Sequence, residues 1–167
     1  DIELILLGLH EDKPHFAPIV SARGGMPRSP AVWRALATLP AEDAAIYGTA
    51  RSLIDWHNGH RFCGQCGSPT KVFRAGWGRK CDGCGKEHFP RTDPVVIMLA
   101  EYQGRVLVGR QAAWPQGNYS ALAGFLEPGE SVEEAVRREI FEEAGVRCGA
   151  VGYVTSQPWP FGGSQLM

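Results

Sequence analysis

The chain has 167 residues, a formal net charge of −1 and an isoelectric point near 6.6, which argues against an extended nucleic-acid-binding surface. This length is enough for one full hydrophobic core plus a smaller unit. No apolar run reaches the length that crosses a bilayer and no signal peptide is visible, so we expect no membrane partner.

The first third of the chain predicts a small α/β domain, residues 1–57. Residues 2–9 are a predicted apolar strand, and the glycine- and proline-rich stretch 14–30 is a predicted connector. Residues 32–39 and 43–56 are predicted helices, because apolar side chains recur near helical spacing in the second of them.

Two cysteine pairs predict a metal site in the following segment, residues 58–90. Cys63 and Cys66 form one CxxC pair, and Cys81 and Cys84 form the other. Two such pairs let four thiolates surround one Zn²⁺ tetrahedrally, which is the arrangement of a zinc ribbon. Because all four ligands are protein sulfurs, no position is open for a substrate, and the zinc is expected to be structural.

Disulfides or a redox CxxC pair are the alternatives for these cysteines. Nothing in the sequence indicates secretion, and a redox motif needs only one pair, so zinc is favoured. Thiols kept for zinc indicate a reducing, cytoplasmic setting. Cys148 is expected to be an idle or buried thiol, while His57 and His60 are left out because four cysteines complete the zinc shell.

Basic and aromatic residues surround the cysteines. They are Arg61, Lys71, Arg74, Arg79, Lys80, Lys86 and Arg91, interleaved with Phe62, Phe73, Trp77 and Phe89. Such a segment is compatible with phosphates and stacked bases. The slightly negative net charge of the whole chain favours the other interpretation, in which the ribbon is a scaffold and the aromatic side chains supply its small core.

The remaining residues, 91–167, predict a mixed β-sheet flanked by helices, an α+β fold. Residues 95–99 and 106–108 are predicted strands on either side of a turn at 103–104, and 149–155 is a further predicted strand. Between them, a glycine-bracketed loop leads into a helix. The helix is expected to begin at a Ser131–Glu134 capping box, to end at Gly145, and to bury Val132, Ala135, Val136, Ile140 and Ala144.

Three glutamates, Glu139, Glu142 and Glu143, share one face of this predicted helix because they stand at i, i+3 and i+4. Carboxylates this close raise each other's proton affinity unless a cation lies among them. Mg²⁺ and Mn²⁺, which prefer oxygen ligands, are the natural occupants. A solvated acidic helix is the alternative, which the pattern around the glutamates disfavours.

That pattern resembles the complete Nudix hydrolase box. It reads Gly124, five residues, Glu130, seven residues, Arg138-Glu139-Ile140, one residue, Glu142-Glu143, one residue, Gly145-Val146. The resemblance implies a Nudix fold and metal-dependent hydrolysis of a nucleoside diphosphate linked to another moiety.

The resemblance also implies catalytic roles. Glu139 and Glu143 are expected to coordinate the catalytic Mg²⁺ or Mn²⁺ together with the backbone carbonyl of Ala123. Glu142 is a further ligand or the base that orients water, and relatives differ on which glutamate is the base. Arg138 is expected to hold Glu130 in place, with a phosphate contact as the alternative.

The zinc ribbon, the Nudix box and the Ser156-Gln-Pro-Trp-Pro-Phe161 array together resemble the NADH pyrophosphatase (NAD diphosphatase) branch, from about residue 50 onward. This branch implies hydrolysis of NADH or NAD⁺ to nicotinamide mononucleotide and AMP by a homodimer. The substrate-binding residues that it implies are Phe89, Phe125, Gln157, Pro158, Trp159, Pro160, Phe161, Gly162, Gly163 and Ser164.

Two prolines restrain the backbone on either side of Trp159, which suits an indole that stacks on a nicotinamide or adenine ring. A proline-bounded turn with Trp159 in the core or at a subunit contact is the alternative. Gly162-Gly163 replaces a proline that many relatives carry next, so the backbone is expected to be looser there.

Two other functions stay open. One is removal of the NAD cap from RNA 5′ ends by the same chemistry, which the basic ribbon suggests. The other is a catalytically silent zinc-ribbon interaction module, because a further metal-binding glutamate of the family lies downstream of residue 167. No initiating Met is present and residues 164–167 resemble the start of a strand, so we expect a longer protein in which residues 91–167 are an incomplete Nudix domain.

Overall fold

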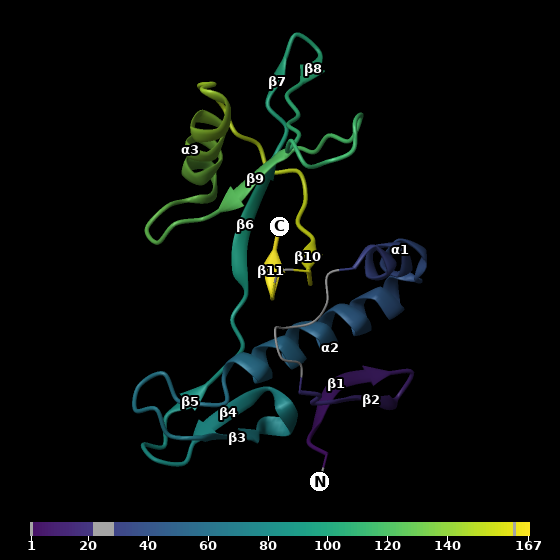
Figure 1. Ribbon diagram of the computed structural model, residues 1–167, viewed down its shortest axis with the longest axis vertical. Helices are drawn as coiled ribbons and strands as arrows, with labels where there is room; N and C mark the ends of the chain where they lie inside the picture. Colours follow the sequence, from purple (N-terminus) through teal and green to yellow (C-terminus); the bar gives the residue numbers. More distant parts are fainter. Residues whose placement is uncertain (1, 22–28, 162) are drawn as a thin grey trace. The chain divides into compact units, whose positions relative to one another are not determined.

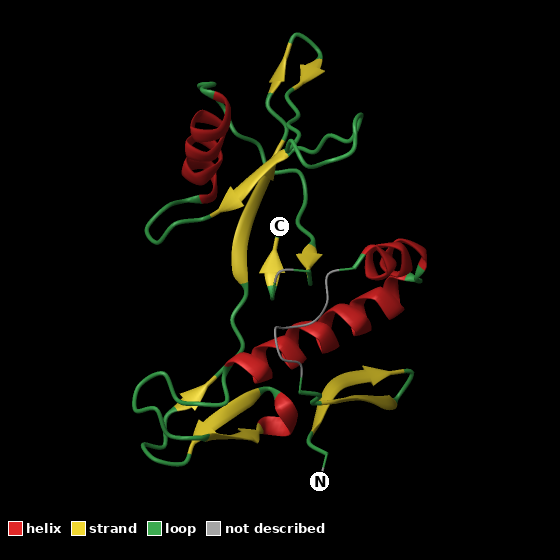
Figure 2. Ribbon diagram, viewed as in Figure 1, coloured by secondary structure: helices red, strands yellow, loops and turns green. Residues whose placement is uncertain are grey.

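The computed structural model describes residues 2–21, 29–161 and 163–167. The chain forms two compact units, the first with residues 1–92 and 158–165 and the second with residues 93–157 and 166–167. Helices and strands occur in both, which confirms the α+β class (Figures 1 and 2). The expected N-terminal domain and zinc ribbon both lie in the first unit, and the division at residues 57 and 90 stays a prediction.

The N-terminal residues form a hairpin. Strand β1 (Leu4–His10) confirms the predicted strand, and it pairs antiparallel with β2 (Lys13–Pro18). The predicted connector at 14–30 is therefore wrong at its start. The prolines of β2 are tolerated because the hairpin has only two strands, and Ala17 faces Ile5 across the pair in the core. Residues 22–28 of the predicted connector lie outside the described residues.

Two helices follow, as predicted. Helix α1 (Pro30–Thr38) begins at Ser29, whose side-chain hydroxyl accepts a hydrogen bond from the Val32 N–H, and Pro30 opens the first turn. Helix α2 (Ala41–Gly59) packs one face on the β1–β2 hairpin. The buried cluster between them consists of Ile5, Ala17, Leu53 and Ile54.

The cysteine-containing segment is a three-stranded antiparallel sheet in the order β3-β4-β5. Its elements are β3 (Thr70–Phe73), the short 3-10 turn η1 (Arg74–Gly76), β4 (Gly78–Cys81) and β5 (Glu87–His88). The Trp77 indole N–H, next to η1, donates a 2.7 Å hydrogen bond to the Leu6 carbonyl of β1. The ribbon is thus tied to the N-terminal hairpin within the first unit.

A buried polar network joins α2 to the ribbon. The Arg79 guanidinium donates to the Thr70 hydroxyl and carbonyl, both at 2.7 Å, and to His57 Nδ1 at 3.1 Å. Because arginine cannot accept a hydrogen bond, Nδ1 must be the acceptor and Nε2–H must donate to the Gly76 carbonyl at 2.8 Å. This network holds His57 neutral. Burial, and next the charge of Arg79, lower the pKa of His57, while the Gly76 bond opposes the shift.

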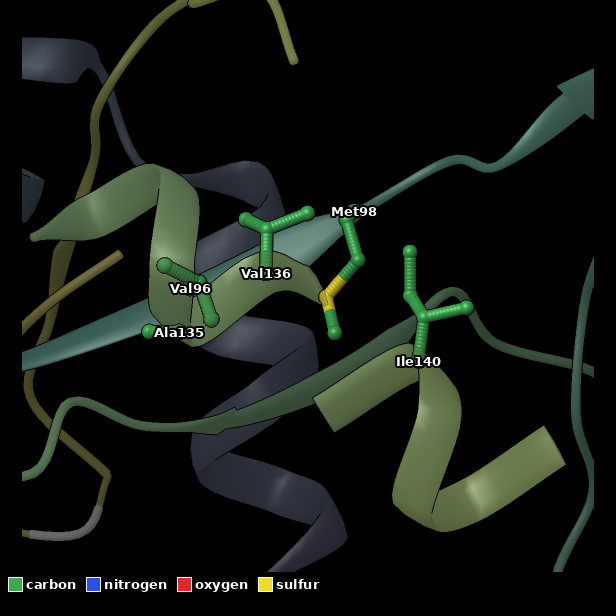
Figure 3. Close-up of a cluster of buried hydrophobic side chains, with 5 residues drawn as sticks. All are labelled: Val96, Met98, Ala135, Val136 and Ile140. Atoms are coloured by element: carbon green, nitrogen blue, oxygen red, sulfur yellow. The ribbon is translucent and has the colours of Figure 1, made fainter. Parts of the chain in front are cut away.

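The second unit is built on the antiparallel pair β6 (Asp93–Met98) and β9 (Leu122–Phe125), covered by α3 (Val132–Ala144). Figure 3 shows the core between them, made of Val96, Met98, Ala135, Val136 and Ile140. Two members of the predicted helical stripe are not buried. Val132 and Ala144 lie exposed in the first and last turns, beyond the reach of the two strands.

The peripheral strands follow the predictions only in part. The turn at 103–104 is confirmed, and it joins β7 (Glu101–Tyr102) to β8 (Arg105–Val106), so the predicted strand 106–108 is strand only at its first residue. The strand predicted at 149–155 is absent from these described residues. Tyr153 and Val154 are 79% and 90% exposed, which shows that this apolar run lacks a face to pack on.

The last described residues form a second hairpin. Strands β10 (Pro158–Trp159) and β11 (Gln165–Leu166) are hydrogen-bonded neighbours, and Gln157 and Met167 exchange two backbone hydrogen bonds of 2.7 and 2.9 Å. The strand expected to begin at 164–167 is therefore confirmed. Among the helices of the described residues, none combines the length and apolarity needed to cross a bilayer.

The His57 network predicts a pH-dependent stability. Because the folded-state pKa of His57 is lowered, its contribution is complete above the unfolded pKa of about 6.5 and is lost as the pH falls from there toward the folded pKa. Urea denaturation from about pH 8 to about pH 5.5 measures the free energy of unfolding. His57→Gln should flatten the profile in this window. His10→Gln, at an exposed histidine, should not, and a steep profile retained in His57→Gln would contradict the assignment.

Candidate active site and zinc site

Helix α3 begins and ends where the sequence predicts. The Ser131 hydroxyl accepts from the Glu134 N–H at 3.2 Å, and the Glu134 carboxylate accepts from the Ser131 N–H at 2.8 Å. Gly145 ends the helix in the left-handed conformation, with φ of 67°, which a glycine adopts without strain. The capping box and Gly145 together determine where α3 begins and ends, and therefore which turn carries the glutamates.

Arg138 is the centre of the site on α3. Its Nε and Nη2 donate to the two oxygens of Glu130 at 2.6 and 2.9 Å, a bidentate pair. Nη2 also donates to the Phe125 carbonyl of β9 at 2.9 Å. The hydrogen bond from Arg138, and next the N–H of Glu127, lower the pKa of Glu130 to about 2. The same carboxylate raises the pKa of Arg138, so this pair is ionised across the physiological range.

The remaining donor of Arg138 faces the helix. Its Nη1 donates to Glu139 at 2.9 Å and to Glu142 at 3.0 Å. The Glu139 side chain is 14% exposed and the Glu142 side chain is 57% exposed. Of the two carboxylates that contact this nitrogen, that of Glu139 is therefore the more buried. Glu143 is exposed beside them. One cation thus compensates several neighbouring carboxylates, and it holds them on one side of the helix.

Gly124 in β9 gives the Glu139 carboxylate its room. A Cβ at residue 124 would overlap the carboxylate carbon and both oxygens of Glu139. Ala123, the residue before it, pairs with Ile97 in the β6–β9 ladder, which sets the direction of the strand at this point. The first glycine of the sequence pattern is therefore explained by a close approach between strand and helix.

The donor set suits a hard divalent cation, because carboxylates and a backbone carbonyl are the ligands that Mg²⁺ and Mn²⁺ prefer. The glutamates are nevertheless spread more widely than the cysteines. Among the described residues, the cysteine set alone brings three or more metal-binding side chains within 4.8 Å of one another. Coordination by Ala123, Glu139, Glu142 and Glu143 stays a prediction.

The four cysteines do gather as the zinc prediction requires. The Sγ atoms of Cys63 and Cys84 are 3.8 Å apart, and those of Cys66 and Cys81 are 3.4 Å apart. Tetrahedral Zn–S bonds of about 2.3 Å place sulfurs roughly 3.8 Å apart, so the cluster fits Zn²⁺. Backbone and hydroxyl hydrogen bonds from Ser68 lower the pKa of Cys66, while, against the backbone hydrogen bond from Lys86, the neighbouring thiols raise the pKa of Cys84, as expected for sulfurs this close to one another.

Backbone amides also support the cluster. The Gln65 N–H donates to Cys63 Sγ at 3.4 Å, and the N–H groups of Gly83 and Cys84 donate to Cys81 Sγ at 3.3 and 3.4 Å. Cys148 lies outside it, partly buried against the core of the second unit.

The basic residues of the ribbon are largely engaged within the first unit. Lys71 pairs with Asp82 at 3.1 Å, and Lys80 lies 3.7 Å from Glu87. Arg79 is buried in the network described above, and Arg74 lies 5.1 Å from the Phe89 ring centre. These contacts support the scaffold interpretation.

The residues predicted to bind substrate fall into two groups. The rings of Phe89 and Phe125 are 38% and 52% exposed and are accessible for stacking. The rest belong to the β10–β11 hairpin, in which Gln157 closes the base, Gly163 has a positive φ, and the Ser164 hydroxyl lies 3.5 Å from that of Thr92. Gly162 lies outside the described residues. Substrate contacts by all of these residues stay predictions.

Two residues that were not among the predicted site residues contact this hairpin. The Trp33 ring of α1 stacks on Phe161, and the buried Arg51 of α2 donates a 2.7 Å hydrogen bond to the Pro160 carbonyl. No spacing rule reveals them, because they approach residues more than a hundred positions away. The one available signal was that a single arginine stands in the apolar face of a predicted helix.

Comparison with family models accounts for nearly the whole chain. Residues 1–56 match the NADH pyrophosphatase-like rudimentary NUDIX domain, residues 59–89 match the NADH pyrophosphatase zinc ribbon domain, and residues 90–165 match the NUDIX domain.

Similar proteins come from plants, animals and bacteria. Chloroplastic Nudix hydrolase 19 of Arabidopsis thaliana is 50% identical over 75% of this chain and 30% of its own length. Human mitochondrial NAD(P)H pyrophosphatase NUDT13 is 45% identical over 80% of this chain and 38% of its own length. The NAD-capped RNA hydrolase NudC of Chromobacterium violaceum is 37% identical over 96% of this chain and 62% of its own length. The chain therefore spans about a third to three fifths of these relatives.

The close approach at Gly124 gives a testable prediction. Gly124→Ala places a methyl group where the Glu139 carboxylate lies, so it should displace that side chain and cost about 1–3 kcal/mol of stability. Titration calorimetry with Mn²⁺ should show weaker binding than in the parent protein. Gly149→Ala is the matched control, since a Cβ at residue 149 meets no atom within 4 Å. Unchanged Mn²⁺ affinity in Gly124→Ala would contradict the proposed role of Glu139.

The cysteine cluster gives another. Cys66→Ser should remove stoichiometric zinc, measured by elemental analysis, and should lower the thermal unfolding temperature, because four-sulfur sites contribute directly to folding. Cys148→Ser, outside the cluster, should retain the zinc. Equal zinc content in both variants would refute the ligand set.

Proposed function

Because this chain belongs to the Nudix hydrolase family, in the branch with an NADH pyrophosphatase zinc ribbon, we propose that its protein hydrolyses the pyrophosphate of NADH or NAD⁺. The products are nicotinamide mononucleotide and AMP. The observation that carries this proposal is the Arg138-centred carboxylate site on α3, with Glu139 seated against Gly124.

Each residue of the proposed site has a separate role. Glu139 and Glu143, with the Ala123 carbonyl, would hold Mg²⁺ or Mn²⁺, which supplies positive charge against the pyrophosphate and activates water. Glu142 is a further ligand or the base. Arg138 fixes the direction of Glu139 and Glu142 through one nitrogen while its other two anchor it to Glu130 and β9.

The proposed reaction is the hydrolysis of one phosphorus–oxygen bond of the pyrophosphate. A water oxygen forms a new bond to one phosphorus, and the bond from that phosphorus to the bridging oxygen breaks. The bridging oxygen leaves with the other phosphate, and one proton is released to the base or solvent. The protein lowers the barrier by positioning and by compensating the charge that develops on the phosphate oxygens.

The partners follow from the same proposal. The Trp159 indole and the exposed rings of Phe125 and Phe89 are each proposed, separately, as stacking surfaces for a ring of the dinucleotide. A homodimer and a reducing, cytoplasmic setting are proposed with it, the second because four free thiols are arranged for zinc. The Zn²⁺ is structural, since four sulfurs fill its shell.

Removal of the NAD cap from RNA is the second candidate. The observation that favours it is the similarity to the NAD-capped RNA hydrolase of Chromobacterium violaceum over 96% of this chain. The internal pairing of the ribbon lysines disfavours a broad RNA surface. A catalytically silent module is a third reading, in which the carboxylates serve only the structure.

Incubation of the full-length protein with NADH and Mg²⁺ tests the main proposal. The expected products are AMP and nicotinamide mononucleotide, resolved by chromatography. Glu139→Gln and Glu143→Gln should each lower turnover by about a hundredfold or more, because each removes a charged ligand. Glu133→Gln, an exposed glutamate in the first turn of the same helix, should match the parent enzyme.

The same assay separates the candidates. NAD-capped oligonucleotide is compared with NADH across a salt series. Phosphate contacts along an RNA would make hydrolysis of the capped oligonucleotide fall steeply with salt while NADH hydrolysis changes little. Turnover of neither substrate would support the silent module and would end both enzymatic proposals.

A further inference from the structure

Helix α1 supplies an aromatic platform to the β10–β11 hairpin. The rings of Trp33 and Phe161 are stacked, with centroids 3.6 Å apart and an interplanar angle of 9°. Trp159 contacts both rings edge-on, with centroid distances of 5.1 Å to each. Phe161 is only 7% exposed, so its side chain is occupied by the protein itself. Stacked and edge-on aromatic contacts of this kind stabilise one arrangement of the rings.

Helix α2 fixes the backbone of the same segment. Arg51 is 1% exposed, and its Nε donates a 2.7 Å hydrogen bond to the Pro160 carbonyl, the residue between Trp159 and Phe161. Its Nη1 lies 3.3 Å from the Tyr47 hydroxyl, one helical turn earlier. Burial of a guanidinium costs free energy unless its N–H donors make hydrogen bonds. Loss of this contact would therefore cost free energy at both the Arg51 donor and the Pro160 carbonyl acceptor.

Helix α2 also packs against the Pro160 ring. Residue 48 lies one turn before Arg51, and an added Cβ there would lie 3.5 and 3.7 Å from two carbons of the Pro160 ring. A methyl group is thus accommodated in ordinary contact, whereas a longer side chain would push Pro160 away. The close approach of α2 at residue 48, the Arg51 hydrogen bond and the Trp33 ring thus restrain the segment at Pro160 and Phe161.

We propose that Arg51 and Trp33 are positioning residues, which hold the Trp159–Phe161 segment on α1 and α2 so that the Trp159 indole is presented to the dinucleotide. Phe161 serves in this arrangement as an anchor against Trp33. The proposal rests on the proposed function for its substrate. It gives the rudimentary N-terminal domain a role in the reaction that no catalytic motif indicates.

Arg51→Gln tests the proposal in the full-length protein. If the segment binds the dinucleotide equally in ground and transition states, its loss of order should raise KM for NADH about tenfold and leave kcat within about twofold. Arg51→Lys keeps a cation that donates to one carbonyl and should recover part of the affinity. Gly48→Leu, which displaces Pro160 without touching the arginine, should reproduce the KM effect, whereas Gly48→Ala should not.

Leu53→Ala is the control for stability alone. Leu53 lies on α2 in the cluster with Ile5, away from Pro160, so its loss should destabilise the fold by about 2–5 kcal/mol without changing KM. A KM increase in Leu53→Ala equal to that in Arg51→Gln would overturn the proposal, because the effect would then follow stability and not position.

A spectroscopic measurement separates this proposal from the proposed function. The protein is labelled with 5-fluorotryptophan, and the Trp159 resonance is assigned by its absence in Trp159→Phe. This resonance should shift in Arg51→Gln and Gly48→Leu and stay in place in Gly48→Ala and Leu53→Ala. An unmoved resonance overturns the proposal even if NADH is hydrolysed. A resonance that moves in these variants, together with no hydrolysis of NADH by the parent protein, would support the positioning role and refute the proposed substrate. If Arg51→Gln does not fold, Gly48→Leu gives the same decision.

Discussion

The site on α3 depends on a single guanidinium that faces several carboxylates. Arg138 reaches Glu130, Glu139 and Glu142 and still donates to the Phe125 carbonyl. Without that charge, the carboxylates on one helical face would repel one another and turn apart. With it, Glu139 stays seated against Gly124, where only the absence of a Cβ leaves room. This interaction restrains the carboxylates that the proposed metal site would use.

The same device recurs elsewhere in the chain. Arg138 donates to the carbonyl of Phe125, Arg79 to that of Thr70 and Arg51 to that of Pro160, and each bond joins the arginine's own element to another segment. An arginine can bond a backbone carbonyl and a side chain at once because its donors form a rigid fork. In small units with limited hydrophobic cores, such bonds restrain backbone segments that apolar packing alone would hold less firmly.

Local signals predicted the elements that depend on neighbours along the chain. The Ser131–Glu134 capping box and Gly145 bounded α3 correctly, and the cysteine pairs came together within 4.8 Å. Predictions failed where apolar or proline-containing stretches gave no local signal that separates strand from loop. The β2 strand was missed although its partner β1 is the neighbouring segment, because its prolines suggested a connector, and residues 149–155 stay irregular because Tyr153 and Val154 have no face to pack on. Apolar composition alone does not distinguish these two outcomes.

The sequence by itself determined which metal-binding residue types are present and where: the order of glutamates, glycines and cysteines places carboxylates on one helix face and thiols in two CxxC pairs. Only the tertiary structure decided which side chains from distant parts of the chain pack against one another. It placed Trp33 on Phe161 and Arg51 on Pro160, across more than a hundred residues of chain. The physical reason is that periodicity and capping act over a few residues, whereas packing joins side chains whose separation along the chain carries no signal.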